Sequence, residues 1–244
     1  MSTKTNDEKK YLRMTLNERI QHFLLLSSFI VLVITGFGLV FPESFWVRWI
    51  VSIIGENAFE LRGDVHRVAS VVLILAGVYH IFYLVFTQRG KKLFKDMLPA
   101  KKDLSDLGKS FRYFVSKSGE KPRYGRFSYV EKMEYWAVFW GTVIMGITGL
   151  VRWFENIFLP IINVAGMDIA IAIHYYEAIL ATLAIVVWHF YFVFINPDVF
   201  PMNKAWLTGY VSRKVMEEEH PLELEEIEKE ERESDTNSVK TDEL

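Results

Sequence analysis

The amino-acid sequence predicts an all-α integral membrane protein with four transmembrane helices and with both termini in the cytoplasm. Hydrophobic residues make up 51% of its 244 residues, and aromatic residues make up 15%. The charged residues, by contrast, lie almost entirely outside four long apolar runs. This segregation is typical of proteins that cross a lipid bilayer.

Each apolar run, with its flanks, is long enough to cross a bilayer. A membrane-spanning helix needs about 20 residues at about 1.5 Å of rise each. Trp and Tyr gather at the ends of the runs, as is typical of the membrane–water interface. We therefore predict four spans, at about residues 20–41, 66–87, 131–152 and 169–195.

The distribution of Lys and Arg between the segments outside the spans predicts the orientation. The N-terminal segment 1–16 and the loop 88–130 are rich in basic residues, and the remaining loops hold few. The positive-inside rule therefore places both segments in the cytoplasm. Residues 17–199 form the transmembrane domain, and its first two spans connect these two segments. Residues 200–244 form an acidic cytoplasmic tail, which we expect to be disordered or a solvated helix with His220 on its surface.

The basic loop contains the sequence LSDLGKSFRYFVSKS, in which apolar residues recur at roughly helical spacing among bases. Two interpretations are open. The segment is either an amphipathic helix on the anionic cytoplasmic leaflet or a basic loop that only determines topology.

Two of the apolar runs carry histidines in matched pairs. His66 and His80 are fourteen residues apart in the second run, and His174 and His189 are fifteen apart in the fourth. At about 100° per residue, both members of each pair share one helix face, about 21 to 22 Å apart along the axis. The bundle therefore offers two levels of facing imidazoles, and His22 in the first run is a fifth imidazole.

Paired imidazoles inside a membrane favour haem over a bare metal ion. Histidine is a common haem ligand, whereas small metal sites also use carboxylates or thiols. Glu177 is the only acid inside the apolar cores of the runs, residues 20–41, 68–87, 135–151 and 169–195. The chain has no cysteine, which excludes c-type haem, cysteine-bound iron–sulfur clusters and disulfides. We therefore predict a haem-binding four-helix bundle with two noncovalent haem b groups.

The motifs of the four runs together resemble a known family. The first run contains RIQHFLLLSSFIVLVITGFGL, the second begins with HR, the third contains EKMEYWAVFWGTVIMGITGL, and the fourth holds its histidine pair. Over roughly residues 15–209, the chain resembles the di-haem cytochrome b subunits of membrane-bound formate dehydrogenases, nickel–iron hydrogenases and thiosulfate reductases. The resemblance implies that His66 and His174 bind a haem nearer the outside, and that His22 and His189 bind a cytoplasmic-side haem.

The additional histidine leaves the second ligand set open. The resemblance does not require a histidine at the position of His80, whereas the cytochrome b of bc and bf complexes uses paired histidines in its second and fourth helices. On that pattern His80, rather than His22, pairs with His189. The spare imidazole then contacts quinone, hydrogen-bonds a haem propionate or binds a third haem, and the motif around His22 favours His22 as the ligand.

Further charged and polar residues are candidates for contacts to haem or quinone. Arg67 and Arg152 suit haem propionates. Glu177, one turn after His174, is either a proton relay or quinone contact on the outer side, or an acid that hydrogen-bonds a neighbouring helix. In the formate dehydrogenase type, the loop before the third span lies near the menaquinone pocket, which makes Tyr124 and Lys132 candidate quinone contacts.

These features predict an electron-transfer subunit of a respiratory oxidoreductase complex in the inner membrane of a bacterium or archaeon. The chain has no second redox motif, so we expect it to link the quinone pool, menaquinone or ubiquinone, to a redox partner. The expected partner is a periplasmic multihaem cytochrome c or an iron–sulfur, molybdenum or nickel–iron subunit. We do not expect the protein to bind nucleic acid. The alternatives are a haem-free membrane anchor and a metal transporter that uses intramembrane histidines.

Overall fold

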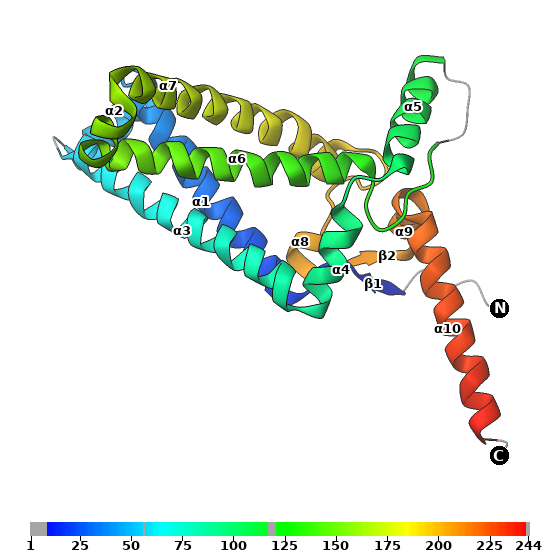
Figure 1. The fold of residues 1–244 in the computed structure, drawn as a ribbon. Coiled ribbons are helices and arrows are strands. Elements are labelled where there is room, and N and C mark those ends of the chain that lie inside the picture. The colour runs from blue at the N-terminus through cyan, green and yellow to red at the C-terminus, as the bar shows by residue number, and fades with distance from the viewer. Residues whose placement is uncertain (1–8, 56, 117–120, 243–244) are drawn as a thin grey trace. The chain divides into compact units, whose positions relative to one another are not determined.

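The structure, a computed structural model, describes residues 9–55, 57–116 and 121–242 and is almost entirely helical (Figure 1). Four helices are long and apolar enough to cross a membrane, which confirms the predicted number of spans. They are Leu16–Val40, Ala58–Phe86, Tyr129–Trp153 and Glu155–Ile195.

The chain forms two compact units. Unit 2 comprises residues 16–87 and 136–191 and holds most of the four spans. Unit 1 comprises the described parts of residues 1–15, 88–135 and 192–244. Each unit therefore combines segments that are distant in the sequence.

Within unit 2, α1 (Leu16–Val40) packs along α3 (Ala58–Phe86) (Figure 1). Hydroxyl groups in these helices form hydrogen bonds to carbonyl groups of the preceding turn; for example, Ser28 Oγ donates to Leu24 O at 2.6 Å. Large apolar side chains nevertheless remain exposed along the spans, as expected of helices whose outer surface is solvated by lipid. The short helix α2 (Phe45–Ile54) connects the pair and ends at Gly55, whose positive φ of 83° suits a residue without a side chain.

The second pair of spans comprises α6 (Tyr129–Trp153) and α7 (Glu155–Leu183). The helix α7 is interrupted at Asn163, which has φ 56° and ψ −177°, three residues after Pro160. Because proline lacks an N–H group and clashes with the preceding turn, it commonly kinks a helix. The predicted fourth span, 169–195, lies entirely after this kink. It ends in two π-helical segments, η1 (Ala184–His189) and η2 (Tyr191–Ile195).

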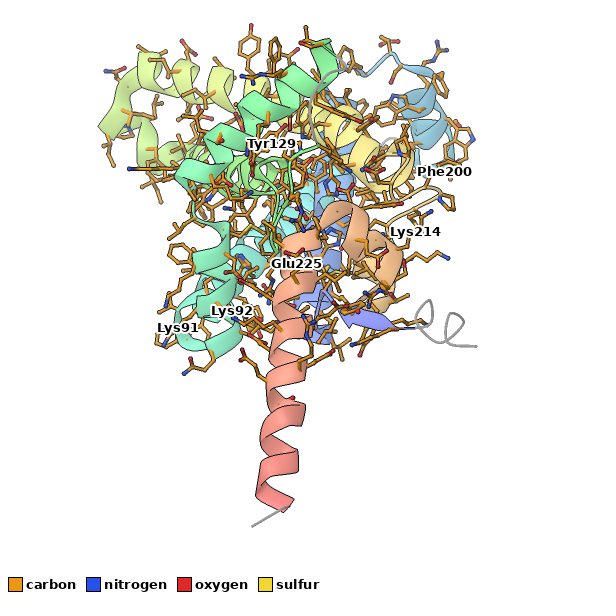
Figure 2. All side chains as sticks on the ribbon, turned by 90° about the vertical axis from the view of Figure 1, so that its right-hand side faces the viewer. Lys91, Lys92, Tyr129, Phe200, Lys214 and Glu225 are labelled. Carbon is orange, nitrogen blue, oxygen red and sulfur yellow. The ribbon has the colours of Figure 1, made fainter. Side chains whose placement is uncertain are left out.

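Unit 1 joins the two ends of the chain. Strand β1 (Lys10–Leu12) pairs antiparallel with β2 (Tyr210–Ser212), so that Tyr11 lies opposite Val211. These two side chains form an apolar core with Met216 and Leu224. The helices of this unit are α4 (Gln88–Met97), α5 (Lys101–Ser116), α8 (Ala205–Thr208), α9 (Arg213–Glu219) and α10 (Pro221–Asp242). Figure 2 shows Lys91 and Lys92 projecting from α4, and Glu225 on α10.

The structure corrects the expectation that His220 is a surface residue, because its side chain is only 6% exposed. Burial lowers the pKa of His220, so the ring is neutral. Its Nδ1–H donates to Gly125 O at 3.0 Å, and its Nε2 accepts a hydrogen bond from Arg13 Nη2 at 3.2 Å. The N-terminal segment therefore folds back over the start of the acidic tail, a long-range contact that local sequence patterns do not reveal.

Candidate functional site

His66 is held by a residue of the neighbouring helix α1. Thr35 Oγ1 lies 2.8 Å from His66 Nδ1 and donates its own proton to Val31 O at 2.7 Å, so it accepts from the imidazole N–H. A Cβ added at Gly36 would lie 3.7 Å from His66 Cε1, so the edge of the ring lies close to the α1 backbone. Because Nδ1 carries the proton, Nε2 keeps the lone pair that can bind iron.

The other pair of spans repeats this arrangement at His174. Thr148 Oγ1 of α6 donates to Ile144 O at 2.8 Å and accepts from His174 Nδ1 at 2.9 Å. A Cβ added at Gly149 would lie only 3.3 Å from His174 Cε1. The imidazoles of His66 and His174, hereafter the first histidine pair, therefore share one tautomer and one kind of support.

Sequence reasoning did not identify Thr35 and Thr148 as functional residues. The available signal was the tripeptide Ile-Thr-Gly, which occurs at residues 34–36 and again at 147–149. The repeat places the same hydroxyl and the same small residue in the first and third spans, each beside a histidine-bearing span. A search for repeated side-chain acceptors in neighbouring spans would have found both residues.

Three arginines lie near the first histidine pair. The charges of Arg62, Arg67 and Arg152 act on His66, and that of Arg152 also acts on His174. Arg62 Nη1 donates to Thr35 O at 3.1 Å. The two predicted arginines are therefore present at this level, together with Arg62, which sequence reasoning missed. Their positive field suits an anionic group.

The other three histidines, hereafter the second histidine group, are His22, His80 and His189. The imidazoles of His22 and His189 lie close enough to each other to interact electrostatically. His80 is held from α1, because its Nδ1 lies 2.7 Å from Gln21 Oε1. An amide oxygen only accepts, so His80 donates through Nδ1 as His66 and His174 do.

His80 belongs to a polar cluster between α1 and α3. Gln21 Nε2 donates to Asn17 Oδ1, Asn17 Nδ2 donates to Tyr79 Oη at 2.6 Å, and the buried Tyr83 hydroxyl donates to Glu18 at 2.9 Å. The rings of His80 and Tyr83 stack with their centroids 6.5 Å apart. We refer to Asn17, Glu18, Gln21, Tyr79, His80 and Tyr83 as the α1–α3 polar cluster.

A π-helical turn explains the unequal spacing of the two histidine pairs. His66 and His80 lie in continuous α-helix, whereas the segment between His174 and His189 ends in η1. A π-turn contains one more residue than an α-turn. The added residue of the π-turn offsets the added residue in the spacing of the fourth span. The histidines of the fourth span therefore have the same angular relation around the helix axis as those of the second. Such turns frequently occur at functional sites.

The remaining predicted site residues lie in different surroundings. A Cβ added at Gly141 would lie 2.9 Å from Glu177 Oε1, so this carboxylate lies against the α6 backbone. Gly141 is eight residues, about 12 Å along α6, from the glycine that contacts His174. In unit 1, Tyr124 is buried with its hydroxyl 3.2 Å from Ser110 Oγ, and Lys132 Nζ lies 3.0 Å from Asp103 Oδ2.

The first histidine pair fits the axial ligands of a haem. Its two imidazoles come from different helices, α3 and α7, and each has its Nδ1 engaged by a threonine. The glycines Gly36 and Gly149 allow both rings to lie close to a neighbouring backbone. Metal-binding histidines almost always hydrogen-bond in this way through their other ring nitrogen.

The chain is similar to known cytochrome b subunits. The cytochrome b556(fdo) subunit of formate dehydrogenase from Escherichia coli (strain K12) is 23% identical over 217 residues, which cover 89% of this chain and 93% of the relative. The cytochrome b556 subunit of formate dehydrogenase from Haemophilus influenzae is 20% identical over 210 residues, which cover 86% and 82%. A family model described as "Prokaryotic cytochrome b561" matches residues 13–201, well over half of the chain. The predicted resemblance is therefore confirmed, and the chain belongs to the prokaryotic cytochrome b561 family, whose name implies a haem b cofactor.

Proposed function

We propose that this protein is a di-haem electron-transfer subunit that links the quinone pool to a redox partner across a prokaryotic inner membrane. The observation that carries the proposal is the first histidine pair, in which two imidazoles from separate spans are held in one tautomer by equivalent threonines. When bound, haem b supplies the one-electron redox change, and the protein sets its position and potential.

The ligand scheme assigns one haem to each level of histidines. His66 and His174 hold the outer haem. His22 and His189 hold the cytoplasmic-side haem, and the closeness of their imidazoles supports this choice. His80 is the spare imidazole, because the motif around His22 favours His22 as the ligand and His80 lies beside groups that can exchange protons in the α1–α3 polar cluster.

Arginines near the outer haem complete its site. Arg62, Arg67 and Arg152 neutralise its propionates. Arg67 also pairs with Asp64 at 2.9 Å and lies over the Trp153 ring at 6.0 Å, contacts that hold the guanidinium in position. This arrangement offsets the cost of holding carboxylates near the apolar bundle.

Quinone reduction takes up protons, and the α1–α3 polar cluster offers groups that exchange them. His80 is engaged through Nδ1, and the buried carboxyl of Glu18 accepts from Tyr83. We assign His80 to proton exchange with quinone rather than to iron or a third haem. The roles of Glu177, Tyr124 and Lys132 in proton transfer or quinone binding stay predictions.

The partner and the orientation follow from the relatives and from the loop charges. The relatives are named as subunits of formate dehydrogenase, which supports assembly with a molybdenum and iron–sulfur module or a comparable periplasmic oxidoreductase. The basic segment 88–130 supports a cytoplasmic position for that loop and for both termini.

The proposal is tested by haem spectroscopy on the purified protein. We expect a reduced-minus-oxidised b-type spectrum with two haems per chain. Single alanine substitutions should remove the same haem at His66 and His174, and the other haem at His22 and His189. His80→Ala should retain both haems and slow the reaction with quinol analogues. A colourless protein, folded and produced with ample haem, contradicts the proposal and favours a haem-free anchor.

Retention of both haems in His22→Ala, with loss of one in His80→Ala, would instead assign His80 as the ligand. Three haems in the wild type, with one lost in His80→Ala, would contradict the role given to His80. These two results leave the cytochrome assignment intact while rejecting the ligand scheme.

A further inference from the structure

The helix α5 turns its polar face inward and its apolar face outward. Asp106 is 2% exposed and Ser110 is 4% exposed, whereas four large apolar side chains stand out from the helix. These side chains, hereafter the α5 stripe, are Leu104 at 75%, Leu107 at 48%, Phe111 at 69% and Val115 at 65% exposure. This is the reverse of the usual helix on a water-soluble domain.

The inward polar face anchors α5 within unit 1. Ser110 Oγ lies 3.2 Å from the hydroxyl of the buried Tyr124. Asp106 pairs with Lys102 one turn away on α5, and Lys102 Nζ donates to Arg123 O at 2.8 Å. Asp103 pairs with Lys132 at 3.0 Å. These contacts fix which side of the helix faces its own unit, so the outward direction of the stripe is set by specific polar bonds.

The stripe is continuous and has a basic border. Its members are spaced by three or four residues, so they fall within an arc of about 80° on the helix surface. Lys101, Lys109 and Arg112 follow along one edge of this arc, at about 40° to 120° beyond Val115. A continuous apolar arc with bases beside it is the pattern of a helix lying in a membrane interface.

The connections of α5 keep it near a bilayer. The span α3 ends at Phe86 and the span α6 begins at Tyr129, so α5 lies in a loop whose two ends leave the membrane on the same side. Only residues 87–100, most of them in α4, separate the end of α3 from α5. This tether gives the stripe a high effective concentration of lipid surface.

We propose that the α5 stripe inserts into the headgroup–acyl boundary of the leaflet that α3 and α6 enter, and that its basic edge binds anionic lipid headgroups. The apolar side chains gain burial in the acyl region, and the lysine and arginine side chains extend to the phosphates. The inference is independent of haem and quinone. It concerns a lipid-binding surface, and a partner protein on the same face is an outcome of the test.

The test measures immersion depth with spin labels. The chain contains no cysteine, so single substitutions give unique labelling sites. The full-length protein carrying Leu104→Cys or Phe111→Cys is reconstituted at one copy per nanodisc in anionic phosphatidylglycerol mixed with phosphatidylcholine. We expect the labels to collide several-fold more with oxygen than with a polar nickel chelate. Ser105→Cys, an exposed position about 100° around the helix from Leu104 and among the residues of the basic edge, is the matched control and should favour the nickel chelate.

Two results would overturn the proposal. Nickel access at Leu104 and Phe111 equal to that at Ser105 would mean that the stripe lies in water. Protection of both labels from oxygen and nickel alike would mean that protein covers it. A third arm, with Lys101, Lys109 and Arg112 all changed to Gln, should reduce immersion in anionic discs but not in pure phosphatidylcholine. Equal immersion in both lipids for the wild type would reject the anionic preference. Matching circular dichroism among the variants checks that each is folded.

Discussion

Thr35 Oγ1 lies 2.8 Å from His66 Nδ1, and this contact recurs between Thr148 and His174 at 2.9 Å. Each hydroxyl already donates to a carbonyl of its own helix, at Val31 or Ile144, so it is left to accept from the imidazole. The contact fixes the tautomer and raises the basicity of the opposite ring nitrogen. Two separate helix pairs therefore hold their histidines in the same tautomer.

Removal of either hydroxyl should weaken the outer haem site. Thr148→Val and Thr35→Val retain the side-chain volume but leave an imidazole N–H without its acceptor. We expect about a tenfold loss of haem affinity for each, a typical effect of losing such a contact. Haem release during titration with apomyoglobin measures the affinity, and the electron paramagnetic resonance spectrum of the ferric haem reports the ligand orientation.

Thr182→Val is the matched control, since Thr182 Oγ1 donates to a carbonyl of its own helix, Ala178 O, at 2.7 Å. Thr148→Ser should restore the wild-type spectrum because serine keeps the acceptor. Equal haem loss in Thr182→Val and Thr148→Val would show a general packing effect. If the effect of each threonine is local, every variant should keep its cytoplasmic-side haem.

The two ring-edge glycines should tolerate alanine unequally. A Cβ at Gly149 would lie 3.3 Å from His174 Cε1, tighter than most real contacts, whereas the corresponding distance from Gly36 to His66 is an ordinary 3.7 Å. Gly149→Ala should therefore shift the ring and alter the resonance spectrum and midpoint potential. Gly36→Ala should leave the resonance spectrum and the midpoint potential close to wild type. The same is expected of the control Gly77→Ala, whose Cβ would meet Thr142 Cγ2 at 3.8 Å. The opposite order would contradict the placement of these rings.

The N-terminal segment should contribute to the stability of unit 1 mainly through Arg13. Its side chain is 9% exposed and binds Glu223, His220 and Arg126 O. Arg13→Ala should destabilise this unit by about 3 kcal/mol, because it leaves partly buried acceptors without their charged donor. Limited proteolysis of α10, followed over denaturant concentration, measures the change.

Lys9→Ala provides the control, because Lys9 and Glu231 form an exposed ion pair, with side chains 40% and 49% exposed. Exposed pairs contribute less than about 1 kcal/mol. Comparable losses in Arg13→Ala and Lys9→Ala would show that burial of the Arg13 network is unimportant.

The contribution of Glu219 to the stability of unit 1 should fall as pH rises toward neutrality. Burial and a hydrogen bond with Asp198 raise the pKa of Glu219 from 4.5 to about 7, and the bond with Glu219 lowers the pKa of Asp198. A raised folded-state pKa means that the contribution of Glu219 is complete below about pH 4.5 and is lost as pH rises through about 7. Lys121, which binds both carboxyl groups, reduces but does not remove this effect.

Glu219→Gln mimics the protonated acid, so thermal unfolding of the variant and the wild type should agree near pH 5. Above about pH 7 the variant should be the more stable of the two. A difference between them that does not change with pH would show that Glu219 is not protonated in the folded protein.

The number of spans was predictable because hydropathy is a local property, and the shared face of each histidine pair stays a prediction from helical periodicity. Lipid acts on each apolar helix separately, and helical periodicity alone puts His66 and His80 on one side. The break at Asn163 and the π-turn before His189 were not predicted, since apolar composition does not distinguish a regular helix from one with an added residue. The burial of His220 depends on a strand pair between distant segments, for which the sequence offers no local signal.

The sequence by itself determined that this chain has four helices long and apolar enough to cross a membrane, because hydropathy is a property of single segments. Only the tertiary structure decided which oxygen holds each ring, namely Thr35, Thr148 or Gln21, because a hydrogen bond between helices depends on their relative register. It also decided which face of α5 points outward, because Ser110 and Lys102 bind Tyr124 and Arg123, which lie outside this helix.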